Sequence, residues 1–432
     1  MRHKRGYRRR GGMYIVVLGT AMIVTVIGLS ALMALRVERR STEGIADFAQ
    51  ARLHAQSAVE MGFHRIASDP DWRTTYPSGV WEADRPIGTG TYTLEGVDPD
   101  DNNLNDSDAD PLVLTGIGTQ GEARYKLQVT LVAEYDPLAC LDVALHAGND
   151  LVFDGVTLQC DQTISANNSA TADGSDIYSA LEVVNTIGGS GTFWDPPTTG
   201  ITPRTMPDPM TVFDSYVAGG TAINLFSLPA SIDETVRYLK RIVLSPASNP
   251  YGATNPKGVY VIDCLGISVI LEDCRIVGTL VLRNPGSATG IFRPVNWEPA
   301  VANYPALMVE GDFAFKTFDT QLSEASTGVN FNPAGTPYLA ASDDTMDDTY
   351  PSLISGIVYV SNDATDDSSF TRTAVNGVWI VGNTLTAIAS SSKDPIYFDL
   401  TYDSRYRDNP PPGFRGPAQV VVSPGTWRQV VD

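Results

Sequence analysis

The hydrophobic pattern begins with an uninterrupted apolar stretch near the N-terminus. Residues Met13–Leu35 contain no charged side chain and directly follow the basic leader MRHKRGYRRRGG. A helix rises about 1.5 Å per residue, so this stretch is long enough to cross a hydrocarbon core of roughly 30 Å. A secretory signal has a shorter apolar region, of about 7–15 residues, followed by a small-residue cleavage site, and this stretch shows neither feature. The pattern predicts a transmembrane helix over residues 13–35.

The helical pattern continues beyond the apolar stretch. Ser68-Asp69-Pro70 ends it, because proline lacks an amide hydrogen and crowds the preceding turn. We therefore expect one stem helix from Met13 to about Ser68, packed against the chain's own sheet, against other subunits, or against both. Apolar residues recur on one face at about 100° per residue, and these are Ile45, Phe48, Ala49, Ala55, Val59, Phe63 and Ile66.

Three segments after the stem alternate between apolar and polar residues, as half-buried strands do. They are residues 90–96, 111–118 and 123–132, and Gln120-Gly121-Glu122 forms the second turn. Together they predict a small antiparallel sheet. Residues 36–135 are thus expected to contain the exposed part of the stem and this sheet.

From about Leu138 the pattern changes to short β-branched runs separated by Gly, Asn, Asp, Ser and Pro. Gly258–Asp263 and Gly278–Leu282 begin 20 residues apart, and Gly356–Ser361 and Gly377–Gly382 begin 21 residues apart. Short strands at such intervals, with polar corners, predict the coils of a β-solenoid, each stacked on the next.

The predicted fold class is therefore α+β, mainly β. It consists of a long N-terminal helix, a small antiparallel sheet, and a right-handed β-helix-like solenoid over residues 138–432, with a β-sandwich as the alternative. Ser268–Val277 resembles one face of a right-handed β-helix. Within this body, Ser231–Leu244 has the spacing of an amphipathic helix with Ser231 as its N-cap. Ala418–Val422 is expected to be a last strand.

Charge separates the leader from the rest of the chain. The first twelve residues hold six of the 30 Lys and Arg residues and no acid, so the remainder, with all 50 Asp and Glu residues, carries a net charge of −26. So acidic a body repels nucleic acid and anionic lipid, which argues against a nucleic-acid partner. The basic leader favours a cytoplasmic N-terminus and directs the body outward.

Gly11-Gly12-Met13 joins the leader to the apolar stretch. This junction resembles the class III leader of type IV pilins and type II secretion pseudopilins. The resemblance implies that a prepilin peptidase cuts between Gly12 and Met13, and that the new N-terminus is methylated. Most members carry a glutamate at the fifth mature position, where this chain has Val17. Its absence is typical of minor subunits at or near the filament tip, the X-type pilus protein and the K-type pseudopilin.

The same resemblance implies a location and a set of partners. The chain would be a single-pass inner-membrane protein with its N-terminus in the cytoplasm and its body in the periplasm or outside the cell. Its partners would be the lipid bilayer, the prepilin peptidase, other pilins or pseudopilins, and the inner-membrane assembly platform. The resemblance covers residues 1–135 and rests, beyond the stem, on the order of elements. A plain signal anchor with an incidental Gly-Gly pair is the alternative.

An acidic segment, residues 98–110, lies between the first two strands of the small sheet. Oxygen ligands at alternating positions suit a hard cation such as calcium, which takes about six to eight oxygens. Asn103 replaces the central glycine of an EF-hand loop, however, and no glutamate closes the segment. The sequence leaves open a calcium site and a solvated acidic turn that binds nothing. The four residues with part of the EF-hand spacing are Asp98, Asp100, Asn102 and Asp106.

The cysteines are few for the length of the chain, and none forms a C-x-x-C pair. In an exported body they could form one or two disulfides, and buried free thiols fit the sequence equally well. They are Cys140, Cys160, Cys264 and Cys274.

Catalytic motifs are scarce. His146 is the only one of the four histidines that lies in the body, and no G-x-S-x-G nucleophile elbow accompanies it. The sequence also lacks a phosphate loop and a dinucleotide fingerprint. Paired carboxylates could act on a sugar polymer, and β-helices host polysaccharide lyases and glycosidases. Only fold analogy supports that alternative.

The predicted function is therefore non-enzymatic. The chain is expected to be a pilin-like minor subunit of a type IV pilus or type II secretion pseudopilus, anchored by residues 13–35 and presenting its β-rich body as a cap or binding module. A membrane-anchored polysaccharide lyase or glycosidase and a calcium-dependent surface adhesin are the two alternatives.

Overall fold

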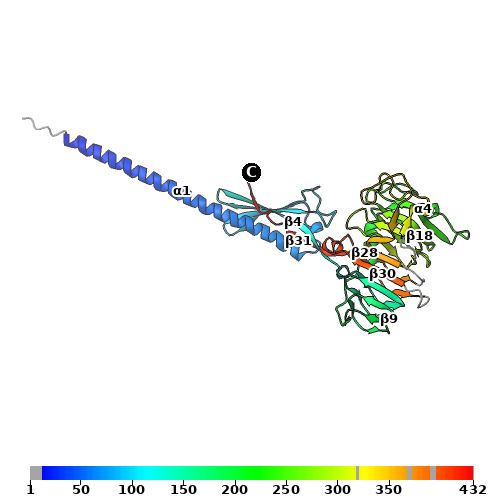
Figure 1. Cartoon of the computed structure of the whole chain (residues 1–432). Coiled ribbons are helices and arrows are strands. Elements are labelled where there is room, and N and C mark those ends of the chain that lie inside the picture. Colours follow the sequence, from blue (N-terminus) through cyan, green and yellow to red (C-terminus); the bar gives the residue numbers. More distant parts are fainter. Residues whose placement is uncertain (1–11, 318–320, 367–371, 390–395, 432) are drawn as a thin grey trace, which may run out of the picture. The chain divides into compact units, whose positions relative to one another are not determined.

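The computed structural model in Figure 1 describes residues 12–317, 321–366, 372–389 and 396–431. The chain divides into two compact units, one made of residues 1–134 and 418–432 and the other of residues 135–417. The architecture is mainly β, with one long N-terminal helix, a small antiparallel sheet and a large parallel sheet. The fold class predicted from the sequence is confirmed at this level.

The first unit is organised around α1 (Gly12–Ser68), a single helix of 57 residues. It ends at Ser68, two residues before Pro70, as the sequence predicted. Residues 12–46 are exposed along their whole length, and Figure 1 shows this part of α1 extending well beyond the small sheet. A short helix, α2 (Trp72–Thr75), follows α1.

The small sheet has six strands, of which the sequence located three. Residues 79–87 form an additional strand at one edge, which the sequence pattern did not predict. The strands are β1 (Gly79–Ile87), β2 (Gly90–Val97), β3 (Leu112–Gln120), β4 (Ala123–Pro137), β31 (Arg415–Val422) and β32 (Arg428–Val430), in the order β1-β2-β3-β4-β31 with β32 also on β4.

The last two strands correct the domain boundary. The sequence placed residues 138–432 in one body, but β31 and β32 pair with β4, so residues 418–432 belong to the first unit. The predicted last strand at Ala418–Val422 exists, within β31. An open sheet edge leaves backbone groups unpaired, and these C-terminal strands cover the edge of β4. The local sequence pattern of residues 415–430 does not indicate that these residues pair with β4.

Helix α1 packs so closely on strand β3 that no side chain fits between the two backbones at the points of contact. A Cβ atom at Gly118 would lie 2.0 Å from the carbonyl oxygen of Ala51, and one at Gly116 would lie 2.2 Å from the carbonyl oxygen of Ala55. Both alanines are fully buried. Glycine in β3 and alanine in α1 therefore remove the side chains that would hold the two backbones apart.

The buried face of α1 differs from the predicted apolar stripe. Ile45, Phe48 and Ala49 are exposed, although the ring of Phe48 lies edge-on against that of Tyr125 in β4, with ring centroids 5.4 Å apart. Ala55 and Val59 are buried as predicted, and Phe63 and Ile66 are half-buried. The stripe was drawn from hydrophobicity alone, whereas close contact selected small residues. The buried residues of α1 are Ala51, His54, Ala55, Ala58, Val59 and Gly62.

The described part of the second unit contains one large sheet and a two-stranded antiparallel sheet of β24 (Gln321–Ser323) and β25 (Thr349–Pro351). The strands of the large sheet are β5 (Leu145–Ala147), β6 (Leu151–Asp154), β7 (Val156–Cys160), β8 (Ile164–Ala166), β9 (Ala170–Asp173), β10 (Asp176–Tyr178), β11 (Leu181–Val183), β12 (Ile187–Gly188), β13 (Thr192–Phe193), β14 (Thr198–Thr199), β15 (Thr221–Ala222), β16 (Val236–Leu244), β17 (Val259–Asp263), β18 (Ser268–Val277), β19 (Thr279–Arg283), β20 (Gly290–Ile291), β21 (Val295–Glu298), β22 (Leu307–Glu310), β23 (Phe313–Phe315), β26 (Leu353–Val360), β27 (Ala364–Asp366), β28 (Arg372–Val381), β29 (Leu385–Ile388) and β30 (Ile396–Tyr402).

The strands of the large sheet pair in parallel, and the two sequence repeats set the register. Val259 of β17 pairs with Thr279 of β19, an interval of 20 residues. Gly356 of β26 pairs with Gly377 of β28, an interval of 21 residues. Both intervals are those predicted from the repeated Gly-led runs. A Cβ at Gly377 would lie 2.1 Å from the carbonyl oxygen of Gly356, so glycine is required at this position within β28.

The end of this unit pairs with its beginning. Strands β28, β29 and β30 lie beside β5, β6 and β7 respectively, so residues 379–381, 385–388 and 396–400 pair with residues 145–147, 151–154 and 156–160. The interior is filled by apolar residues from both halves, including Phe153, Trp379 and Phe398, whose rings contact one another. One core therefore runs through the whole parallel sheet.

The helix expected at Ser231–Leu244 is wrong. Residues 236–244 form strand β16, which pairs in parallel with β18 over its whole length. Ser231 is part of a turn, and Glu234 has a φ of +57°. The apolar residues of this segment fit both a helical and a strand period, and the neighbouring strand decided between them. The described helices of this unit are instead α3 (Pro209–Val217), α4 (Glu324–Thr327) and α5 (Arg405–Asp408), with 3-10 turns η1 (Ala139–Asp142) and η2 (Leu225–Ser227).

We predict that Gly118→Ala weakens the first unit by about 2–4 kcal/mol, because the added methyl group would overlap the Ala51 carbonyl oxygen. Hydrogen exchange of the β3 amides in the full chain measures the local opening free energy. Gly44→Ala is the matched control, since a Cβ there meets nothing within 4 Å. It should stabilise α1 by about 0.5–1 kcal/mol. Unchanged exchange in Gly118→Ala would contradict the close contact.

Candidate functional site

The exposed apolar part of α1 is the most unusual surface of the chain. Within the described residues, α1 is the one helix long and apolar enough to cross a membrane. Large apolar side chains such as Met13, Leu18 and Leu35 are more than half exposed. An apolar surface of this size marks a contact with lipid or with other proteins. The predicted N-terminal apolar helix is present.

The threonine and serine hydroxyl groups of this segment are satisfied within the helix. The hydroxyl groups of Thr20, Thr25 and Ser30 each donate to the backbone carbonyl four residues earlier, at 2.8–3.0 Å. A membrane interior offers no water, so polar groups there need such internal partners. Charged residues begin directly after the segment, where Arg39 pairs with Glu43 at 2.8 Å. The segment therefore meets the requirements of a bilayer interior.

The predicted processing junction lies at the start of α1. Gly12 is the first described residue, and Met13 follows it in the helix with 79% of its surface exposed. The rest of the basic leader, residues 1–11, lies outside the described residues. Val17, at the position where the resembling family carries glutamate, is also exposed.

The structure brings together only part of the predicted calcium set. Asp98 and Asp106 lie close to each other and to Asp110, with carboxylate oxygens within 4.8 Å of one another. Asp100 is not in this group. The Asn102 side-chain oxygen instead accepts a hydrogen bond from the Ser78 hydroxyl at 2.8 Å. Sequence spacing missed Asp110, because the turns of the loop bring its last residue back beside its first.

Two contacts hold this loop in place. Leu104 is buried in the core of the first unit, together with Trp72. The Arg73 guanidinium donates to the backbone carbonyls of Leu104, Asp108 and Asp110, the last at 2.7 Å. The loop is therefore a fixed part of the small sheet, anchored by an apolar and by a polar contact.

The four cysteines are free thiols in the structure, which agrees with the second of the two alternatives that the sequence left open. Three of them are buried, and the fourth, Cys160, packs at the edge of the core. Burial raises the pKa of Cys160 to about 11 and those of Cys264 and Cys274 to about 12, and it raises the pKa of Cys140 further. They are unreactive core residues, because the thiolate is the reactive form.

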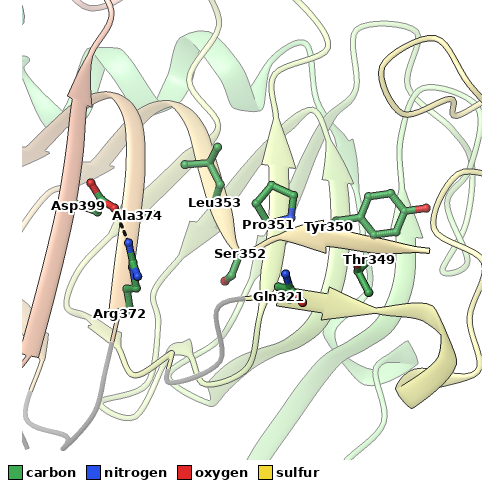
Figure 2. A pocket seen from close by; sticks show the side chains of 9 residues that line it. All are labelled: Gln321, Thr349, Tyr350, Pro351, Ser352, Leu353, Arg372, Ala374 and Asp399. Carbon is green, nitrogen blue, oxygen red and sulfur yellow. Dashed lines mark hydrogen bonds and ion pairs between the residues drawn. The ribbon is translucent and has the colours of Figure 1, made fainter. Parts of the chain in front are cut away.

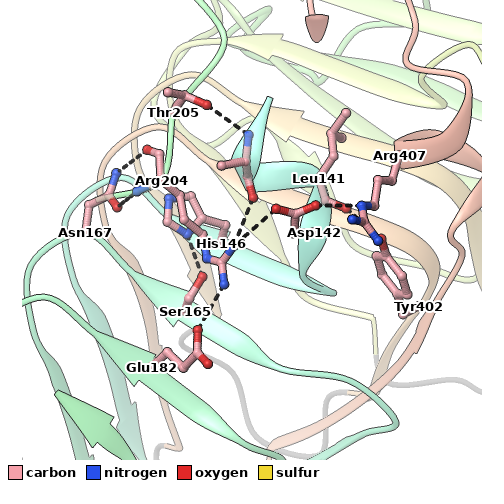
Figure 3. Close-up of polar contacts among 11 residues, drawn as sticks. Leu141, Asp142, His146, Ser165, Asn167, Glu182, Arg204, Thr205, Tyr402 and Arg407 are labelled. Carbon is pink, nitrogen blue, oxygen red and sulfur yellow. Dashed lines mark hydrogen bonds and ion pairs between the residues drawn. The ribbon is translucent and has the colours of Figure 1, made fainter. Parts of the chain in front are cut away.

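His146 is part of a buried polar cluster, shown in Figure 3. Its Nδ1 atom lies 2.7 Å from the hydroxyl oxygen of Ser165, which occupies the paired position on the neighbouring strand β8. Arg204 forms ion pairs with Glu182 and Asp142. His146 and Ser165 are fully buried, so this serine–histidine pair has no access to a substrate. It joins adjacent strands.

A surface pocket of about 390 Å³ lies against β25, β26, β28 and β30. Figure 2 shows the side chains that line it, among them Arg372 and Asp399, which form an ion pair at 2.8 Å. Asp399 is the one carboxylate among the described lining residues. Hydrolysis of a glycosidic bond by acid and base uses two carboxyl groups. The pocket thus presents a closed ion pair in place of that arrangement.

We predict that acid destabilises the second unit through His146. Burial, and then the nearby Arg204 charge, lower the pKa of His146 to about 3, whereas the unfolded chain has a value near 6.5. The unfolded state therefore binds the proton more readily. The stabilisation is complete above about pH 6.5 and is lost as the pH falls, by about 3 kcal/mol at pH 4.

The measurement is denaturant unfolding of the full chain between about pH 7 and pH 4. His146→Gln should flatten the pH dependence of the unfolding free energy relative to the unchanged chain. His64→Gln removes an exposed histidine of α1 and should leave that dependence as it was. Equal slopes in the His146→Gln variant and the unchanged chain would contradict the assignment.

Comparisons with known proteins give little further information. No protein-family model matches the chain, and no curated protein matches its sequence. Among solved structures, the chain is similar to the competence-associated pilin ComZ from Thermus thermophilus, with 12% sequence identity and a TM-score of 0.33. The similarity covers 89% of this chain and 98% of that one. At this TM-score the likeness carries no argument about function, which must be argued from the geometry of the chain itself.

Proposed function

We propose that this chain is a non-enzymatic, pilin-like minor subunit of a type IV pilus or of a type II secretion pseudopilus. One observation carries the proposal. A single unbroken helix combines an uncharged, fully exposed first part, Met13–Leu35, with a last part that packs at backbone distance on an antiparallel sheet. Such a helix joins a membrane or filament core to a folded head without a flexible break.

The middle of α1 supports packing against other stems. Ile45, Phe48 and Leu53 lie beyond the apolar segment, and 70%, 45% and 53% of their surfaces are exposed. Burying apolar surface contributes about 25 cal/mol per Å², so these side chains gain when another apolar helix covers them. In a filament, helices of neighbouring subunits would cover both this surface and the apolar segment.

The N-terminal junction supports processing by a prepilin peptidase. The bond between Gly12 and Met13 joins the basic leader to the apolar helix, and cleavage there would leave α1 intact as the anchor. Val17 offers no carboxylate to the amine of a neighbouring subunit. This difference supports a minor position at or near the tip, like that of the X-type pilus protein or the K-type pseudopilin.

The second unit is proposed to be a β-solenoid that serves as a cap or binding module. The support lies in its parallel pairing, in which most strands lie beside one that is two or three strands away along the chain. Short strands that stack in this way on a shared core are characteristic of solenoids. The buried His146–Ser165 pair and the Arg372–Asp399 ion pair offer no observation that favours an enzyme over this role.

The proposed location follows from the charge distribution. The basic leader keeps the N-terminus in the cytoplasm, and the acidic body lies in the periplasm or outside the cell. The proposed partners are the lipid bilayer, the prepilin peptidase, other pilins or pseudopilins, and the inner-membrane assembly platform.

Intact mass spectrometry of the full chain from native membranes tests the proposal. The mature protein should begin at a methylated Met13 and lack the first twelve residues. Gly12→Val should retain the leader, because the branched side chain blocks the position before the cut. Gly11→Ala, the neighbouring glycine, is the control and should be processed. The unprocessed Gly12→Val chain should also be missing from sheared surface filaments. An intact leader in the unchanged chain would exclude the pilus role.

A further inference from the structure

Three carboxylates converge at the base of the loop between β2 and β3. They belong to Asp98, Asp106 and Asp110, and one oxygen of each lies within 4.8 Å of those of the other two. Asp98 begins the loop, and Asp110 ends it two residues before β3. The two ends of the loop therefore lie close together, and the groups that meet there are three carboxylates of like charge.

Asp98 adds a second, independent observation. It is only 2% exposed, and its Oδ2 atom is buried without a hydrogen-bond partner among the described residues. Its Oδ1 atom accepts a hydrogen bond from the amide of Asp100 at 2.8 Å. Buried polar atoms almost always have partners, and each exception calls for an explanation such as an ion.

A cation removes both costs of this arrangement. Carboxylates at such short distances repel one another, and a buried carboxylate oxygen that lacks a partner is costly. The side chain of Arg73, which belongs to helix α2, contacts the loop and donates hydrogen bonds to the backbone carbonyls of Leu104, Asp108 and Asp110. It fixes the position of the backbone, and the three carboxylates remain directed at one point.

We propose that Asp98, Asp106 and Asp110 bind a calcium ion. Calcium takes about six to eight oxygen ligands in irregular geometry and accepts carboxylates, carbonyls and waters together. Magnesium requires near-octahedral geometry and retains most of its waters, so it is less suited to three protein carboxylates. The bound ion would fasten the two ends of the loop and thereby stabilise the connection between β2 and β3.

This site differs from the one that the sequence predicted. Asp98 and Asp106 are retained, Asp110 joins them in place of Asp100, and no EF-hand spacing is involved. The proposal is independent of the filament role, because it concerns the stability of the first unit alone. A calcium site could be present in a chain that never enters a filament, and the reverse also holds.

The test is thermal unfolding of the full chain in detergent, with EDTA or with calcium added over about 0.1–10 mM, the range of weak extracellular sites. Calcium should raise the unfolding temperature of the first unit, and magnesium at the same concentration should raise it less. Terbium luminescence, sensitised by tryptophan, gives a direct measure of binding at the same site. An unfolding temperature that is equal in EDTA and calcium would overturn the proposal, as would equal protection by magnesium.

Three variants locate the site. Asp98→Asn and Asp106→Asn should each weaken calcium binding by at least about tenfold, since the charge count sets the affinity. Asp101→Asn is the matched control: it removes a charge from the same loop, and its side chain can still accept the hydrogen bond from the Asn103 amide. It should bind calcium like the unchanged chain.

Folding and binding can be separated in these variants. Asp106 is exposed, so Asp106→Asn does not disturb the core. In EDTA it should be at least as stable as the unchanged chain, because one repulsive charge is gone. Loss of binding in Asp101→Asn equal to that in Asp106→Asn would show a diffuse charge effect and would refute the site.

Discussion

The contact between α1 and β3 is the constraint on which the first unit depends. Gly116 and Gly118 expose the strand backbone, and Ala51 and Ala55 bring the helix backbone against it. This close packing fixes the C-terminal part of α1 to the sheet, while residues 12–46 of the same helix are exposed. The free part can therefore reach a membrane or a filament while the small sheet keeps a fixed relation to the stem. Any side chain added at the contact would separate the two backbones.

The second unit depends on a different use of glycine. Where Gly356 and Gly377 stack within β26 and β28, the backbones of successive strands lie too close for a side chain. The spacing of these residues fixes which strand lies beside which, because a slip of one residue would turn the buried side chains outward. Pairing of β28–β30 with β5–β7 then unites the two ends of the unit around one core.

Two features of the first unit lack partners within the described part of the chain. The apolar segment Met13–Leu35 has no cover among the described residues, so it calls for lipid or other helices. The carboxylates of Asp98, Asp106 and Asp110 converge on one point, so they call for a cation. In contrast, His146 and Ser165 are fully buried in the second unit, where their side chains link adjacent strands. Function is therefore expected at the apolar segment and at the three carboxylates rather than at the His146–Ser165 pair.

The sequence by itself determined the features that depend on neighbours along the chain. These are the anchor helix and its end before Pro70, three strands of the small sheet, and the intervals of 20 and 21 residues that set the strand register. The tertiary structure decided everything that depends on distant partners. It made residues 236–244 a strand beside β18, moved residues 418–432 to the small sheet, and placed Asp110 beside Asp98. Local sequence patterns indicate periodicity and turns. These three outcomes instead follow from pairing and loop closure between distant segments, and the sequence of one segment does not indicate which other segment it will contact.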